Sequence, residues 1–91
     1  MKIVCADKNE ATKLASLIFI KDGMETFISS VVNVYENEIV ISLKDKSVHS
    51  IVLRDPEQVE IFTDFIQSVL EKENRITDTK ATNDTVEITK G

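Results

Sequence analysis

The residues best suited to nucleophilic or acid–base chemistry in this sequence are Cys5 and His49, the single cysteine and the single histidine of the chain. A cysteine nucleophile needs a neighbouring base and a positive environment, and a zinc site needs further ligands at fixed spacing. No other His or Cys lies near either residue in sequence. Cys5 stands in the apolar run KIVCA, which favours a small buried hydrophobic side chain.

His49 belongs to the run VHSIVLR, where the alternation of a strand places it on the same side as Ile51 and Leu53. This pattern favours a partly buried strand histidine. A Cys5–His49 dyad is the less favoured alternative. We therefore predict no catalytic residue, no metal ligand and no cofactor for this chain.

Phosphate and divalent-cation sites find little support in the sequence. A phosphate-binding loop needs several glycines ahead of a helix, and the two glycines here are Gly23 and the terminal Gly91. Carboxylates gather in YENE (35–38), with Asp45 in the next loop. Neither place has the spacing of a calcium-binding loop, so we interpret these residues as solvated turns.

A row of carboxylates in DPEQVEIFTDFIQSVLEKE (55–73) is the most distinctive constellation. Glu57, Glu60, Asp64 and Glu71 follow one another at spacings of 3, 4 and 7, which puts them on one face of a helix. Residues 55–73 hold six acidic residues and one basic residue, while the rest of the chain holds ten of each. The whole net charge of −5 therefore belongs to this segment.

Two interpretations of this acidic row stay open. Acidic residues at the start of a helix are favoured by the helix dipole, but Glu71 lies at the opposite, negative end. Glu60 and Asp64 repel each other at i,i+4, at a cost of about 0.2–0.5 kcal/mol. These two costs favour a recognition surface for a basic partner. The alternative is the ordinary solvated face of a helix.

The same segment carries the clearest signals of secondary structure. Asp55 is a good N-cap, Pro56 suits the first helical position, and Gln58 can complete a capping box. The apolar positions cover about half of the circumference and predict a face packed on a sheet. These positions are Val59, Ile61, Phe62, Phe65, Ile66, Val69 and Leu70.

The other elements are predicted from composition and alternation. Residues 2–6 read as a short strand, and residues 25–54 as a three-stranded antiparallel meander with short connections. Residues 7–23 are ambiguous, because Asp7 and Glu10 fit a capping box whereas LIFI and Asp22-Gly23 fit a hairpin. We favour a helix over residues 8–19.

These elements predict an α+β fold. A small antiparallel β-sheet, the three-stranded meander with the N-terminal strand as an addition, packs against a C-terminal amphipathic helix, and a short N-terminal helix completes it. We expect one globular domain over residues 1–75 and a polar flexible tail over residues 76–91, since the tail is rich in threonine. TVEIT (85–89) alternates and would form a strand where a sheet edge accepts it.

The bulk properties limit the class of protein. The 91 residues, 42% of them hydrophobic and 30% charged, are typical of a soluble globular domain. No secretion signal or membrane-spanning run is visible, and a lone cysteine fits a reducing compartment, so we expect a cytoplasmic protein. No run of Lys or Arg exceeds one residue, which argues against direct nucleic-acid binding.

These expectations lead to two functional hypotheses. The first is a non-enzymatic protein-binding module, an inhibitor that covers a basic, nucleic-acid-binding surface of a partner protein through Glu57, Glu60, Asp64 and Glu71. In composition the chain is similar to small phage-encoded inhibitors, some of which mimic the charge of DNA, although no motif carries this similarity. The alternative is a structural subunit that forms homo-oligomers through its sheet edges.

Overall fold

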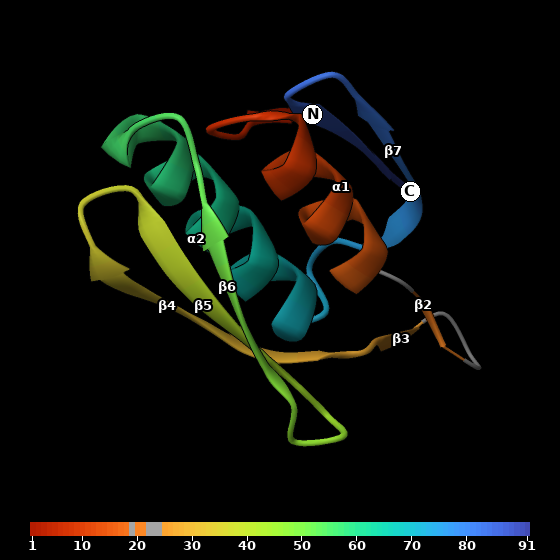
Figure 1. The fold of residues 1–91 in the computed structure, drawn as a ribbon. Coiled ribbons are helices and arrows are strands. Elements are labelled where there is room, and N and C mark those ends of the chain that lie inside the picture. Colours follow the sequence, from red (N-terminus) through yellow and green to blue (C-terminus); the bar gives the residue numbers. More distant parts are fainter. Residues whose placement is uncertain (19, 22–24) are drawn as a thin grey trace.

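The computed structural model describes residues 1–18, 20–21 and 25–91 and shows an α+β fold (Figure 1). In chain order its elements are β1 (Lys2–Val4), α1 (Lys8–Leu17), β2 (Ile20–Lys21), β3 (Glu25–Thr26), β4 (Ile28–Tyr35), β5 (Glu38–Leu43), β6 (Val48–Val52), α2 (Pro56–Leu70), β7 (Ile76–Thr82) and β8 (Thr85–Lys90). In Figure 1 the strands β4, β5 and β6 lie on one side of the molecule and β7 on the other, with the helices between them.

The strands form two three-stranded antiparallel sheets, with the orders β4-β5-β6 and β1-β8-β7, and a short β2-β3 pair. The predicted meander over residues 25–54 is confirmed in β4, β5 and β6. The sequence analysis treated the N-terminal strand as an addition to the meander, whereas β1 pairs along its length with β8. An isolated bridge between Cys5 and Leu53, just after β1, connects this part of the chain to the meander.

This seam between the two sheets is short because the chain leaves it for α1. The amide of Ala6 donates to the carbonyl of Val52 at 3.0 Å, and the amide of Arg54 donates to the carbonyl of Val4 at 3.0 Å. Asp7 then caps α1, its Oδ1 accepting from the amide of Glu10 at 2.9 Å. The part of β6 before Val52 therefore has no strand on this side in the described part of the chain.

Residues 76–91, expected as a flexible tail, instead form the hairpin β7-β8. Ile76, Val86 and Ile88 are buried, and Val86 lies opposite Ile3 of β1. The prediction is corrected for a physical reason. A sheet with one solvated face needs apolar residues only at alternate positions, and threonine favours strands, so a polar composition is compatible with order.

The helix predicted over residues 8–19 is confirmed in α1, which ends at Leu17. Ala11, Leu14 and Leu17 are its buried residues, and the helix packs on β7 and β8. The alternative prediction of strand structure in the same segment is also partly confirmed, because Ile20 and Lys21 pair with Thr26 and Glu25 in β2-β3. The turn signal Asp22-Gly23 lies outside the described residues.

Helix α2 begins as predicted, with Asp55 accepting from the amide of Gln58 at 3.0 Å. The side chain of Gln58 differs from the expectation of a capping box. Its Oε1 accepts from the amide of Val4 at 2.8 Å, and the residue is buried. Gln58 thus supplies a partner for the edge of β1 where β6 does not.

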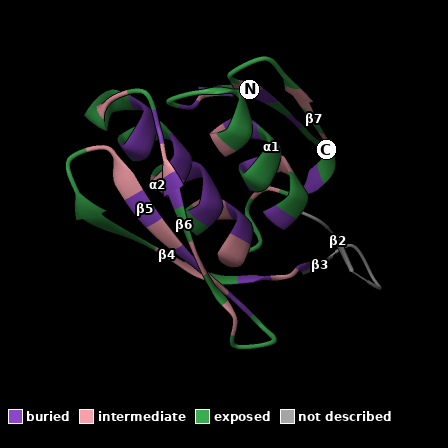
Figure 2. Cartoon of the chain, viewed as in Figure 1, coloured by how far each residue is buried: buried purple, intermediate pink, exposed green. Residues whose placement is uncertain are grey.

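The core lies between the helices and the inner faces of the sheets (Figure 2). From α2 it receives Val59, Phe62, Phe65, Ile66 and Val69, which confirms most of the predicted apolar face, whereas Ile61 remains 37% exposed. Fully burying one such side chain stabilises the fold by about 1.5–3 kcal/mol. Within the described ranges, neither helix is long and apolar enough to span a bilayer.

Candidate functional site

The predicted acidic row is a continuous exposed face of α2. Glu57, Glu60, Asp64 and Glu71 are all exposed, and the opposite side of the helix is buried in the core. We call these four residues the acidic face. The apolar side of α2 packs in the core and fixes the rotation of the helix about its axis. The carboxylates therefore point to solvent whether or not they make contacts of their own.

The ion pairs of Lys13 with Glu10, at 2.8 Å, and of Arg54 with Asp55, at 2.7 Å, do not involve the acidic face. The charge of Glu57 does act on Arg54, since this carboxylate, after Asp55, helps to raise the pKa of the guanidinium. Of the four, Glu71 has a side-chain partner, since it accepts from Nε2 of Gln67 at 2.9 Å. The face therefore presents a group of exposed carboxylates to solvent.

Near the start of α2 the charge is balanced. The hydrogen bond from Arg54 and the amide of Gln58 lower the pKa of Asp55 below its usual value. Both effects stabilise the ionised carboxylate that caps the helix. Asp55 is consequently a structural residue, which separates it from the acidic face that follows it along α2.

Cys5 is a buried structural thiol, as expected. It is 1% exposed, and burial, with the nearby charges of Glu10, Asp84 and Asp7, raises its pKa to about 12. Its bridge partner Leu53 lies four residues along β6 from His49, about 13 Å at the usual strand rise. The structure therefore does not bring Cys5 and His49 together.

His49 is half-buried on the inner side of β6, as the alternation predicted. Its Nε2 lies 2.9 Å from Oγ of Ser47, and that hydroxyl donates to Oδ1 of Asp45 at 2.6 Å. These contacts link Asp45, Ser47 and His49 and order the β5-β6 turn.

The carboxylates of the turns do not assemble a metal site in the described residues, where no group of three or more His, Cys, Asp or Glu side chains could hold an ion. Asp45 is engaged by Ser47, whose side chain and amide both donate to it, and these bonds lower the pKa of Asp45. This agrees with the interpretation of Asp45 as a turn residue.

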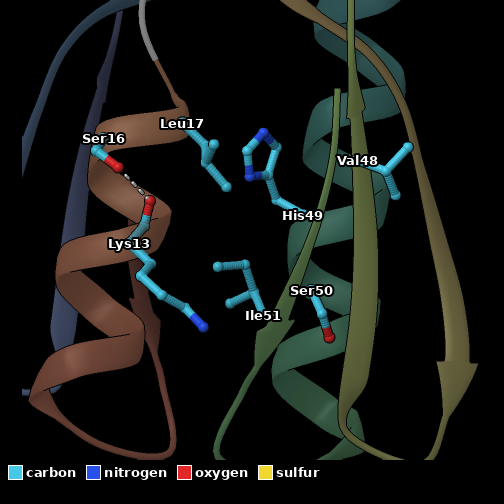
Figure 3. Close-up of a pocket in the computed structure, with 7 residues that line it drawn as sticks. All are labelled: Lys13, Ser16, Leu17, Val48, His49, Ser50 and Ile51. Atoms are coloured by element: carbon cyan, nitrogen blue, oxygen red, sulfur yellow. Dashed lines mark hydrogen bonds between the residues drawn. The ribbon is translucent and has the colours of Figure 1, made fainter. Parts of the chain in front are cut away.

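A groove of about 400 Å³ lies between α1 and β6 and was not predicted by the sequence analysis (Figure 3). From α1 it is lined by Lys13, Ser16 and Leu17, which follow the i, i+3, i+4 spacing of one helix face. From β6 it is lined by four consecutive residues, 48–51. Successive strand side chains point to opposite faces, so this wall is the edge of the strand, including its backbone.

The outer face of the β4-β5-β6 sheet is a second surface that the sequence analysis did not single out. Directly opposed residues share a face, which assigns to it Ser30, Val32, Tyr35, Glu38, Val40, Ser42, Val48, Ser50 and Val52. Val32, Tyr35 and Val48 are more than half exposed. Val40, the exception to alternation in EIVISLK, was the available signal, because it is an apolar residue on the polar side of its strand.

No protein-family model, no curated protein and no solved structure matches this chain. The functional argument therefore depends on the geometry of its own surfaces.

Proposed function

We propose that this chain is a non-enzymatic protein-binding module whose acidic face covers a basic surface of a partner protein. The observation that carries the proposal is the concentration of the entire net charge on residues 55–73, with Glu57, Glu60, Asp64 and Glu71 exposed together. A partner surface that binds nucleic acid through Lys and Arg is complementary to it, and covering that surface would inhibit the partner.

The physical basis is electrostatic steering followed by desolvation. A surface of one sign accelerates encounter with its complement and disfavours partners of the same sign. Ile61, which is 37% exposed, adjoins Glu60 and offers some apolar contact area beside the charges. Apolar area next to charged residues is common in protein interfaces.

The test compares two double charge reversals with the same change in net charge. Glu60→Lys with Asp64→Lys alters the acidic face, whereas Glu36→Lys with Asp78→Lys alters two exposed carboxylates on β-hairpins away from it. Glu71 is left unchanged because Gln67 binds it. Each variant is immobilised and exposed to a lysate of the source cells, which is then washed at rising salt.

The expected result is a partner captured by the natural chain and by the control reversal but lost from the acidic-face reversal. The natural complex should weaken as salt rises, because screening acts over about 8–10 Å at physiological ionic strength. Circular dichroism should show that both variants remain folded. Equal capture by both variants, with the same salt dependence, would mean that the acidic face is a solvated helix surface.

A structural subunit is the second candidate, and the outer face of the β4-β5-β6 sheet favours it. Val32, Tyr35 and Val48 are exposed on this face, and exposed apolar patches often mark association surfaces. Sedimentation at rising concentration should then show species above the monomer mass of 10.2 kDa. Val32→Lys with Val48→Lys should return them to the monomer, and a natural chain that stays monomeric throughout would exclude this candidate.

A further inference from the structure

We infer that the groove between α1 and β6 accepts an extended peptide segment of another protein, which adds to β6 as a new strand. This site is separate from the acidic face, so the inference does not depend on the proposed function. The peptide is uncharged where it lies in the groove and carries small β-branched or apolar side chains at alternate positions.

The first argument is the direction of the backbone groups of β6. Leu43 donates to Ser47 and Leu53 to Asn37, at 2.9 and 2.8 Å, on either side of the ladder. In an antiparallel pair the bonded residues alternate, so His49 and Ile51 are bonded to β5. The amides and carbonyls of Val48, Ser50 and Val52 therefore point away from β5.

The second argument is that strand pairing at this edge has already begun. The carbonyl of Val52 accepts from Ala6, the last residue of the chain to pair here before α1 begins. In the described part of the chain, the next outward groups, the amide and carbonyl of Ser50, have no backbone partner. An added strand would continue the line that β1 leaves, and it would satisfy these groups in sequence.

The third argument comes from the protection of the other sheet edges. Edge strands are usually guarded against pairing by bulges, charges or proline. In the β4-β5-β6 sheet, the opposite edge β4 has two register shifts in its pairing with β5. In the β1-β8-β7 sheet, β7 has a register shift and carries Asp78 and Lys80.

In contrast, β6 has the sequence VHSIV, without Lys, Asp, Glu or Pro, and its pairing with β5 has no register shift. Of the edges β4, β6 and β7, β6 is the unguarded one. The guarded edges β4 and β7 would be poor donor strands in a second copy of this chain, and we assign the groove to another protein; pairing of β6 with the β6 of a second copy is an outcome that the test distinguishes.

The lining defines the chemistry of the peptide. Leu17 and Ile51 form an apolar floor, and Figure 3 shows His49 and Ile51 directed toward α1 while Val48 and Ser50 point to the other side of the strand. The one charged lining residue, Lys13, is paired with Glu10 at 2.8 Å. A neutral segment with alternate small apolar side chains therefore fits both the floor and the outer face beside Val48.

The test uses a displayed library of random nonapeptides as the probe. The natural chain is used for selection, and enriched peptides are synthesised with blocked ends and titrated into the ¹⁵N-labelled chain. We expect amide shifts concentrated at residues 48–52 and 13–17. Ser16→Trp fills the groove and should weaken binding at least tenfold.

Thr12→Trp is the matched control for the groove. Both Ser16 and Thr12 are exposed on α1 and donate to a carbonyl of the preceding turn, but Thr12 does not line the groove. Binding should be unchanged in this variant. Peptides that bind both tryptophan variants equally, or a library that yields no binder sensitive to Ser16→Trp, would overturn the inference.

Two proline variants test the backbone directly. Ser50→Pro removes an outward amide of β6 without removing a bond to β5, so the fold is retained and peptide binding is lost. Ala81→Pro is the matched control on the edge strand β7. Val86, which lies opposite Ala81, directs its own backbone groups toward β1, so the amide of Ala81 also points outward and its removal breaks no bond to β8. Shifts of residues 48–52 that depend on concentration of the chain alone, and disappear in Ser16→Trp, would instead identify a second copy as the occupant and refute our assignment.

Discussion

The amide of Val4 donates a hydrogen bond to Oε1 of Gln58 across 54 positions of sequence, at a distance of 2.8 Å. The carbonyl of Val4 accepts from the amide of Arg54, while its amide finds a side chain from the first turn of α2 in place of a strand carbonyl. The bond ties α2 to the β1-β8-β7 sheet, and the same helix packs on β4 of the other sheet.

Replacing the side chain of Gln58 should lower the free energy of unfolding, although a polar side chain contributes little by burial of apolar surface. Gln58→Ala leaves the partly buried Val4 amide without its acceptor, and we expect a loss of about 1–3 kcal/mol in the free energy of unfolding. The measurement is urea denaturation followed by circular dichroism. Gln67→Ala on the exposed side of α2 removes only the bond to Glu71, so its effect should stay within about 0.5 kcal/mol. Equal losses in the two variants would show that Val4 finds another partner.

The buried face of α2 should dominate the stability of the domain. Phe62 is fully buried, and Phe62→Ala should destabilise the fold by about 3–5 kcal/mol through lost burial and the cavity left behind. Ile61→Ala on the same helix is the control, since Ile61 is 37% exposed. We expect it to cost about 1–2 kcal/mol, less than Phe62→Ala, because part of its side chain is exposed. A small effect of Phe62→Ala in denaturant unfolding would contradict the packing of α2.

The hairpin β7-β8 should be required for folding. Ile88 is fully buried in the central strand of its sheet, and Ile88→Ala should cost about 2–5 kcal/mol. The neighbouring Thr89 is exposed, so Thr89→Ala is expected to shift stability by no more than about 0.5 kcal/mol. Thermal melts distinguish the outcomes. If Ile88→Ala melts like the natural chain, the segment behaves as the flexible tail that its composition first indicated.

The thiol of Cys5 should make stability dependent on alkaline pH. Its pKa is raised from 9.0 to about 12, so in the folded state it holds its proton where the unfolded chain loses it. The contribution of this thiol to the free energy of unfolding is therefore fully present below about pH 9, and it is lost as the pH rises from there toward 12. Denaturant unfolding between pH 8 and 11 tests this, and Cys5→Ala should remove that component of the slope. A thiol reagent that labels the native chain at pH 8 as fast as the unfolded chain would contradict the burial.

The elements whose structure follows from nearby residues were accessible from the sequence. Asp55 and Asp7 cap their helices because a short acidic side chain reaches an amide three residues on, and this geometry is local. The acidic face could be predicted for the same reason, since helical periodicity alone places Glu60 and Asp64 on one side.

The features that the sequence did not reveal depend on pairing over long distances. Nothing near Gln58 shows that its amide oxygen will meet Val4, and nothing in VHSIV shows that one edge of the strand will face α1. The pairing of β8 with β1 joins residues near opposite ends of the chain, and threonine-rich alternation has no local feature that distinguishes an ordered strand from a solvated segment. The groove exists because the chain leaves the edge of β6 after Ala6 and continues as α1, and no local sequence pattern shows this.

The position of β8 between β1 and β7 also determines when the domain can form during synthesis. β1 is translated long before its ladder partners in β8, and the amino group of Met1 donates to the carbonyl of Ile88, 87 positions further along the chain, at 2.9 Å. While residues 85–90 are still inside the ribosome, the chain has its helices and its meander but only one of its two sheets. Contacts between distant segments form late and slowly, so the nascent chain must keep Ile3 and its neighbours from other partners until residues 85–90 have left the ribosome.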